Sequence, residues 1–220
     1  MRCIVIALLF CAVCAPPALA GAWLREQKTA FTALGATVRG HDQGIDYETR
    51  FYLEYGLRPR VTLGLDFNEI PGKAGHALVF ARLPLGRPDR RTRLALELGL
   101  GGHHWQRDWA AMYKIALAAG RGFESRLGNG WMGVETAVER RTGLSDPAFK
   151  LDTVVGLSSG FRFRPLIKLE TAYMRGQPFS WALKPGVMFD LAGSTWVVGL
   201  ERRSAAQDTL GVTFGLWRNF

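Results

Sequence analysis

The stretch DTLGVTFGLWRNF, from Asp208 to Phe220, alternates between two kinds of side chain up to the last residue. Leu210, Val212, Phe214 and Leu216 form an apolar set, and small or polar residues lie between most of them. Because a β-strand turns successive side chains to opposite faces, this pattern predicts a strand with one apolar face. A chain that ends on such a strand leaves an apolar edge uncovered. Closure of the sheet into a barrel removes that edge.

This stretch resembles the C-terminal strand of Gram-negative outer-membrane β-barrel proteins. In that class a terminal phenylalanine, preceded by alternating apolar residues, is recognised by the barrel-assembly machinery. The resemblance implies that the barrel-assembly machinery is a partner of this chain. Arg218 departs from the pattern, because the class more often has an aromatic residue there. The residues to which the resemblance assigns the assembly signal are Phe220, Leu216, Phe214 and Val212.

Residues 1–20 have the pattern of a cleaved secretory signal peptide. Arg2 supplies a positive start, Ile4 to Val13 is apolar, and Ala18-Leu19-Ala20 is a small-x-small cleavage site. The apolar run is shorter than the roughly 20 residues that a membrane-spanning helix needs. The sequence therefore predicts export, with a mature domain over residues 21–220.

The composition of residues 21–220 excludes several classes of protein. The three cysteines of the full sequence, Cys3, Cys11 and Cys14, all lie in the leader. The mature chain therefore has neither a disulfide nor a thiolate metal site. Without Arg2, 27 of the 28 basic residues remain against 19 acidic residues, which leaves a net charge of +8. Since an exported chain rarely meets nucleic acid, we expect no nucleic-acid partner. The phosphates of outer-membrane lipids and lipopolysaccharide are the expected partners of this positive charge.

Alternation of the same kind recurs between turns marked by proline or glycine. We predict about twelve strands of roughly 9–11 residues, the length of a tilted transmembrane strand, with ten as the alternative count. An even number places both termini on one side, the periplasm in single-chain bacterial barrels. Residues 21–28 are predicted as a short periplasmic lead-in. The predicted strands are 29–39, 47–55, 61–67, 77–83, 94–100, 109–117, 132–138, 151–157, 167–173, 181–189, 196–200 and 208–220.

Alternation alone does not say which face meets lipid, because a soluble barrel turns its apolar faces inward. Charges of both signs on the polar faces favour a wet lumen. Aromatic residues at strand ends, such as Tyr47, Tyr55, Trp109, Tyr173, Trp181 and Trp196, favour an interfacial girdle. The predicted lumen-lining residues are Glu48, Arg50, Glu54, Asp66, Glu97, Lys114, Glu135, Glu139, Asp152, Lys168, Glu170, Lys184 and Glu201.

The four histidines, His41, His76, His103 and His104, are predicted near the extracellular rim. Imidazole suits divalent metal ions, but no histidine pair has a dedicated ligand spacing, so polar rim residues are the favoured interpretation. A lipid hydrolase needs a hydroxyl within reach of a base, and no serine lies beside a histidine in the sequence. We therefore predict no catalytic residue, no metal and no cofactor.

Taken together, the sequence predicts an all-β protein: one antiparallel up-and-down transmembrane β-barrel in the bacterial outer membrane. Its expected function is structural, or that of a narrow passive channel for small polar solutes. Two alternatives stay open at this point. One is a lipid-active outer-membrane barrel enzyme, and the other is a soluble periplasmic ligand-binding barrel.

Overall fold

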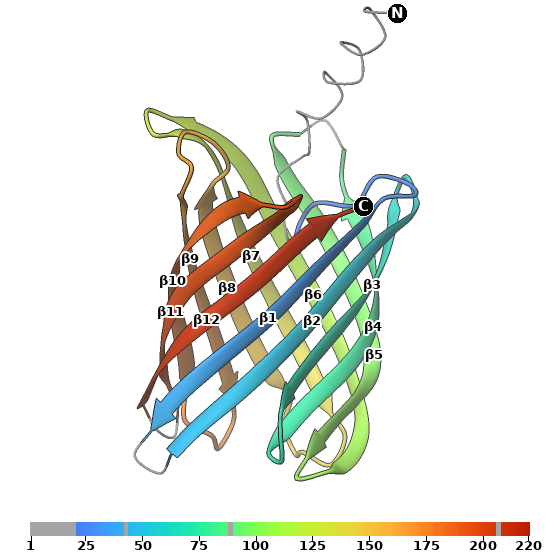
Figure 1. Ribbon diagram of the computed structural model, residues 1–220. Coiled ribbons are helices and arrows are strands. Elements are labelled where there is room, and N and C mark those ends of the chain that lie inside the picture. Colours follow the sequence, from blue (N-terminus) through green and yellow to red (C-terminus); the bar gives the residue numbers. More distant parts are fainter. Residues whose placement is uncertain (1–20, 42–43, 88–89, 206–207) are drawn as a thin grey trace, which may run out of the picture.

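The computed structural model describes residues 21–41, 44–87, 90–205 and 208–220, and the predicted signal peptide lies outside this part. The described chain forms a barrel of tilted strands (Figure 1). The strands are β1 (Ala30–His41), β2 (Gly44–Arg58), β3 (Val61–Ile70), β4 (Ala74–Leu85), β5 (Thr92–Trp105), β6 (Asp108–Ser125), β7 (Gly128–Arg141), β8 (Ala148–Leu157), β9 (Arg164–Met174), β10 (Ser180–Leu191), β11 (Ser194–Ser204) and β12 (Asp208–Asn219). Among the described residues, no helix has the length and apolar character of a membrane span.

Every strand pairs antiparallel with its neighbours in sequence, and β1 pairs with β12 to close the barrel. At this seam Leu34 lies opposite Leu216, and Val38 lies opposite Val212. The ladder continues to the last residue, because Ala30 N donates to Phe220 O at 3.1 Å and Phe220 N donates to Ala30 O at 2.9 Å. The predicted up-and-down β-barrel is confirmed, and the strand count is twelve rather than ten.

The two faces of each strand differ in the way that the alternation predicts. On β5, for example, Leu100 is 60% exposed on the outer wall, while Glu97 is 4% exposed on the inner wall. Leucine, isoleucine, valine and aromatic side chains make up the outer wall on all twelve strands. This arrangement is the opposite of a soluble barrel, whose apolar side chains fill the interior.

Short turns join the strands, and both described ends of the chain lie at the same end of the barrel (Figure 1). We call this the terminal end. Two of the turns are two-residue hairpin loops with positive φ at both positions, Gln106-Arg107 and Ala192-Gly193. Such turns match the right-handed twist of the flanking strands, so they join long strands with little excess chain.

The segment of residues 21–28 does not form the predicted lead-in outside the barrel. Instead it lies in the lumen at the terminal end, where Arg25 N donates to Thr62 Oγ1 at 2.9 Å and the Arg25 side chain pairs with buried Glu54. Glycines on the inner wall make room for it. A Cβ on Gly56 would lie 1.9 Å from the Glu26 carbonyl oxygen, and one on Gly120 would lie 2.3 Å from the Trp23 ring. We call residues 21–28 the lumen segment.

Substitution of Gly56 by alanine is expected to expel the lumen segment, because the added Cβ occupies the position of a backbone carbonyl. Arg25 then becomes accessible, and trypsin should cut the folded barrel after this residue. The matched control is Gly40→Ala, since a Cβ there meets nothing within 4 Å. The measurement is the intact mass of the folded protein after limited proteolysis. Equal resistance of G56A and G40A would contradict the placement of the segment.

Candidate functional site

The lumen collects the charged side chains that the sequence predicts there. All thirteen predicted residues lie on the inner face of their strands, and most of them take part in ion pairs. Because some of these pairs join strands that are not neighbours in the sheet, the side chains must meet inside the barrel. The structure gathers the thirteen residues into two chains of ion pairs, two smaller contacts and two residues, Asp152 and Lys168, that have no ion pair within the described part of the chain.

The first chain closes on itself and crosses the lumen. Glu48 on β2 accepts from Arg50 Nε at 2.6 Å, and Arg50 Nη1 donates to Glu170 Oε1 on β9 at 3.1 Å. Lys184 Nζ lies 2.5 Å from Glu170 Oε2 and 3.2 Å from Glu201 Oε2. Arg39 completes the circuit by pairing with both Glu201 and Glu48. We call this the ion-pair ring, and its members in order are Glu48, Arg39, Glu201, Lys184, Glu170 and Arg50.

The second chain follows the inner wall from the lumen segment to β7. Arg82, at 1% exposure, pairs with Glu54 and with Glu97, whose Oε2 lies 2.5 Å from Arg82 Nη2. The Tyr52 hydroxyl accepts from Arg82 Nη2 at 2.8 Å. Lys114 extends the chain, because its Nζ lies 2.9 Å from carboxylate oxygens of both Glu97 and Glu135. Since buried charges without partners are costly, this continuous pairing stabilises a charged interior.

Smaller contacts account for the next three predicted lumen residues. Glu139 pairs with Lys150 Nζ at 2.6 Å and with Arg141 Nη2 at 2.9 Å. Asp66 Oδ1 lies 3.6 Å from His76 Nε2. Asp152 Oδ1 accepts from the Thr171 backbone amide at 3.3 Å. Lys168 is the last of the thirteen, and its Nζ lies 5.6 Å from the centre of the Trp217 ring.

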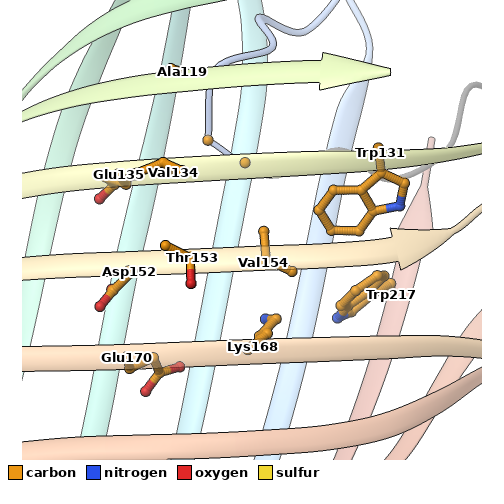
Figure 2. Close-up of a pocket in the computed structure, with 12 residues that line it drawn as sticks. Ala119, Trp131, Val134, Glu135, Asp152, Thr153, Val154, Lys168, Glu170 and Trp217 are labelled. Atoms are coloured by element: carbon orange, nitrogen blue, oxygen red, sulfur yellow. The ribbon is translucent and has the colours of Figure 1, made fainter. Parts of the chain in front are cut away.

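A cavity of about 170 Å³ opens beside Asp152 and Lys168. Figure 2 shows the Trp131 and Trp217 rings at one side of it, and Glu135, Asp152 and Glu170 at the other. Lys168 and Val154 lie between the two sides. Trp131 forms a buried apolar cluster with Leu166 and Met188, and Trp217 packs against this cluster. The cavity thus has an apolar side and a charged side, and we call it the lumen cavity.

Sequence reasoning missed several inward residues. Arg39 belongs to the first strand, whose small residues gave no clear facing, and Arg82 lies on a strand that is apolar on both faces. Trp131 and Trp217 also point inward. Trp131 is four residues from Glu135 in the same strand, and Trp217 is four residues from Thr213. Because residues an even number apart share a face, the alternation predicts that both tryptophans point inward.

The histidines lie at the end of the barrel opposite the termini, and they do not converge. His103 Nε2 lies 3.1 Å from the Thr142 carbonyl oxygen, and His41 Nε2 lies 3.4 Å from Asp46 Oδ2. His104 faces the outer wall, where its Nε2 lies 2.7 Å from Glu69 Oε2. Within the described ranges, no group of three or more histidine, aspartate or glutamate side chains is placed to hold a metal ion.

The pair of His104 and Glu69 depends on Gly75, which lies between them in the sheet. A Cβ at this position would lie 2.3 Å from Glu69 Oε2, so the two side chains reach across the glycine. The Trp109 ring packs against the His104 imidazole, with the ring centroids 4.8 Å apart. For His76, His103 and His104, the described contacts include no serine hydroxyl, so the outer-wall pair lacks the nucleophile of a Ser-His hydrolase.

Replacement of Arg82 by methionine should destabilise the barrel by about 3–5 kcal/mol, because Glu54 and Glu97 would remain buried and lose a shared partner. The matched control is Arg164→Met, which removes a rim pair with Asp190. The Asp190 side chain is 59% exposed, so the expected loss is below about 1 kcal/mol. Equilibrium unfolding of both variants in urea measures the difference. Similar losses would show that the second chain of ion pairs is hydrated.

No family model matches this sequence, and no curated protein matches it. The fold has relatives among solved structures. The KdgM porin aligns with a TM-score of 0.61 at 8% identity, over 86% of this chain and 99% of the porin chain. The NanC porin aligns with a TM-score of 0.60 at 10% identity, over 84% of this chain and 98% of the porin chain. An outer-membrane channel from Pseudomonas putida F1 aligns with a TM-score of 0.57 at 12% identity, over 94% of this chain and 100% of the channel chain. The resemblance to outer-membrane β-barrel proteins is therefore confirmed at the level of the fold, which is that of small outer-membrane channels.

Proposed function

We propose that this protein is an outer-membrane β-barrel that acts as a narrow passive channel for small polar solutes. The observation that carries the proposal is the division of side chains between the two walls. Apolar side chains cover the outside of every strand, and ion pairs line the inside. An apolar outer band over a polar interior is the arrangement of transmembrane barrels. The likeness in fold to the KdgM and NanC porins supports the same function.

Aromatic side chains support the membrane position of this band. Tyr47, Trp109 and Tyr173 are exposed on the outer wall near the end opposite the termini, whereas Tyr55 and Trp196 are exposed near the terminal end. Two such girdles mark the two membrane–water interfaces of a barrel. In the proposed orientation the terminal end faces the periplasm, as in other barrels with an even number of strands.

Basic side chains at both rims support contact with lipid phosphates. Arg58, Arg60 and Arg87 are exposed at the terminal end, and Arg140 and Arg202 are exposed at the opposite end. Guanidinium groups suit the phosphates of lipids and lipopolysaccharide. Two other rim arginines form ion pairs with carboxylates on the inner face instead, Arg141 with Glu139 and Arg164 with Asp190.

The narrowness of the proposed channel follows from what the lumen holds. The lumen segment lies in the terminal end, and the ion-pair ring crosses the interior between β2 and β9. The stacked rings of Tyr52 and Phe80, with centroids 5.5 Å apart, occupy part of the wall between them. Only small solutes and ions can pass such an interior.

Two observations disfavour the alternative functions. A soluble ligand-binding barrel would expose its polar face to water, whereas here the exposed face is apolar. A lipid-active enzyme would need a hydroxyl at the outer-wall pair of Glu69 and His104, and the Trp109 ring packs against His104 there instead. The passive channel is the function that both walls support.

Planar-bilayer recording tests the channel directly, and discrete conductance steps in KCl are the expected result. Arg50→Gln should raise the single-channel conductance, because it removes the contact that crosses the lumen. Arg60→Gln, on an exposed turn, is the control and should leave the conductance unchanged. Both variants must first run as compact species on a gel without boiling. A closed trace from correctly folded protein would overturn the channel.

Phe220→Ala tests the proposed assembly signal. The Phe220 side chain is 63% exposed, while its backbone makes both closing hydrogen bonds to Ala30. The variant should therefore fold in detergent as well as the native chain, but insert several-fold less into outer membranes of cells. Quantification of the heat-modifiable band in both settings measures this. Equal loss in detergent would assign Phe220 to stability rather than to recognition by the assembly machinery.

A further inference from the structure

The lumen cavity contains the two lumen charges that the ion-pair chains do not use. Among the described residues, Asp152 and Lys168 have no oppositely charged atom within 4.0 Å, although both line the cavity. Every other predicted lumen residue has such a partner, except that the partner of Asp66 is the imidazole of His76. An unpaired charge in a confined site gains free energy when a ligand of opposite charge binds it. Asp152 and Lys168 are therefore suited to bind a ligand that carries one positive and one negative charge.

The positions of Asp152 and Lys168 in the sheet fit a small zwitterion. Asp152 pairs in the sheet with Glu170, and Lys168 pairs with Val154, so the two residues lie on a diagonal between β8 and β9. The α-carbons of diagonal neighbours of this kind are about 7–8 Å apart. Side chains at this separation can hold an ammonium and a carboxylate that belong to one small molecule.

The other side of the cavity supplies an apolar surface. The Trp131 and Trp217 rings and Val154 face the space (Figure 2), and Trp131 packs against Leu166 and Met188 behind it. Apolar surface of this size favours contact with an apolar group over contact with water. A volume of about 170 Å³ lies below the roughly 300–1,000 Å³ of ordinary ligand pockets, which restricts the occupant to a small molecule.

We propose that the lumen cavity is a selectivity site for α-amino acids with apolar side chains. Asp152 accepts hydrogen bonds from the ammonium group, Lys168 donates to the carboxylate, and the two indole rings hold the side chain. Gly21 of the lumen segment lines the same cavity, so a solute leaving it toward the terminal end passes beside this segment. The proposal rests on the channel function and names its preferred solute class.

L-Leucine is the probe, added to single channels recorded in KCl. It should interrupt the current in a concentration-dependent manner. Three related molecules each lack one feature of the ligand: N-acetyl-leucine lacks the cation, leucinamide lacks the carboxylate, and glycine lacks the apolar side chain. Each should require about tenfold higher concentration or more. For N-acetyl-leucine and leucinamide the reason is the loss of a hydrogen bond between charged groups. For glycine the reason is the loss of the apolar burial of the side chain, about 1.5–3 kcal/mol.

Lys168→Met and Asp152→Asn should weaken the effect of leucine by about tenfold each. Their matched controls are Lys150→Met and Asp66→Asn, which alter lumen charges that do not line the cavity. The controls should respond to leucine as the native channel does. The assignment is wrong if leucine and glucose reduce the current equally, or if K168M behaves like K150M.

Calorimetric titration of leucine into the folded barrel in detergent separates this proposal from the channel itself. Binding that K168M abolishes, in a protein that passes no current, would sustain the site and overturn the channel. Ion conductance without leucine binding would sustain the channel and overturn the site. Gel migration before and after heating shows whether each variant is folded. Only folded variants are compared, so a loss of leucine binding or of current is not caused by misfolding.

Discussion

The structure depends on a single constraint, the pairing of the first strand with the last. In hydrocarbon no water is present to satisfy backbone N–H and C=O groups, so a sheet that spans a membrane must close. Here β1 and β12 provide that closure, and the backbone of Phe220 exchanges two hydrogen bonds with Ala30 at the seam. Closure also fixes the facing of every strand, since the side-chain period of two then separates an outer wall from an inner wall.

The inner wall is stabilised by pairing of acidic with basic side chains, rather than carrying an excess of one sign of charge. The ion-pair ring alternates three acids with three bases, and the second chain does the same from Arg25 to Glu135. Pairs that run around the wall connect neighbouring strands or, as in Arg39 with Glu201 and Arg82 with Glu54, strands that are separated by one other strand. The contact of Arg50 with Glu170 joins opposite parts of the wall. A charged interior can persist in this form because each buried carboxylate has a cation within reach.

Much of this arrangement could be predicted from the sequence, because parity is a local property. The alternation at Leu94–Leu100 indicates the outer wall without any knowledge of tertiary structure, and Glu97 then follows as an inner residue. The partners of each charge could not be predicted, since contacts such as Arg50 with Glu170 depend on the tilt and closure of the whole barrel. The lumen segment has no periodicity, and its place is set by absent side chains at Gly56 and Gly120.

The balance of the lumen also bears on which solutes it favours. A pore lined by one sign of charge concentrates ions of the opposite sign, whereas a lining of ion pairs presents little net field along the path. A zwitterion meets no net electrostatic barrier in such a pore, but it interacts strongly wherever a single acid and a single base lack an oppositely charged partner. Asp152 and Lys168 supply that place beside the two tryptophans. In the proposed channel, the pairing elsewhere in the lumen is thus what leaves Asp152 and Lys168 as the two charges that select a solute.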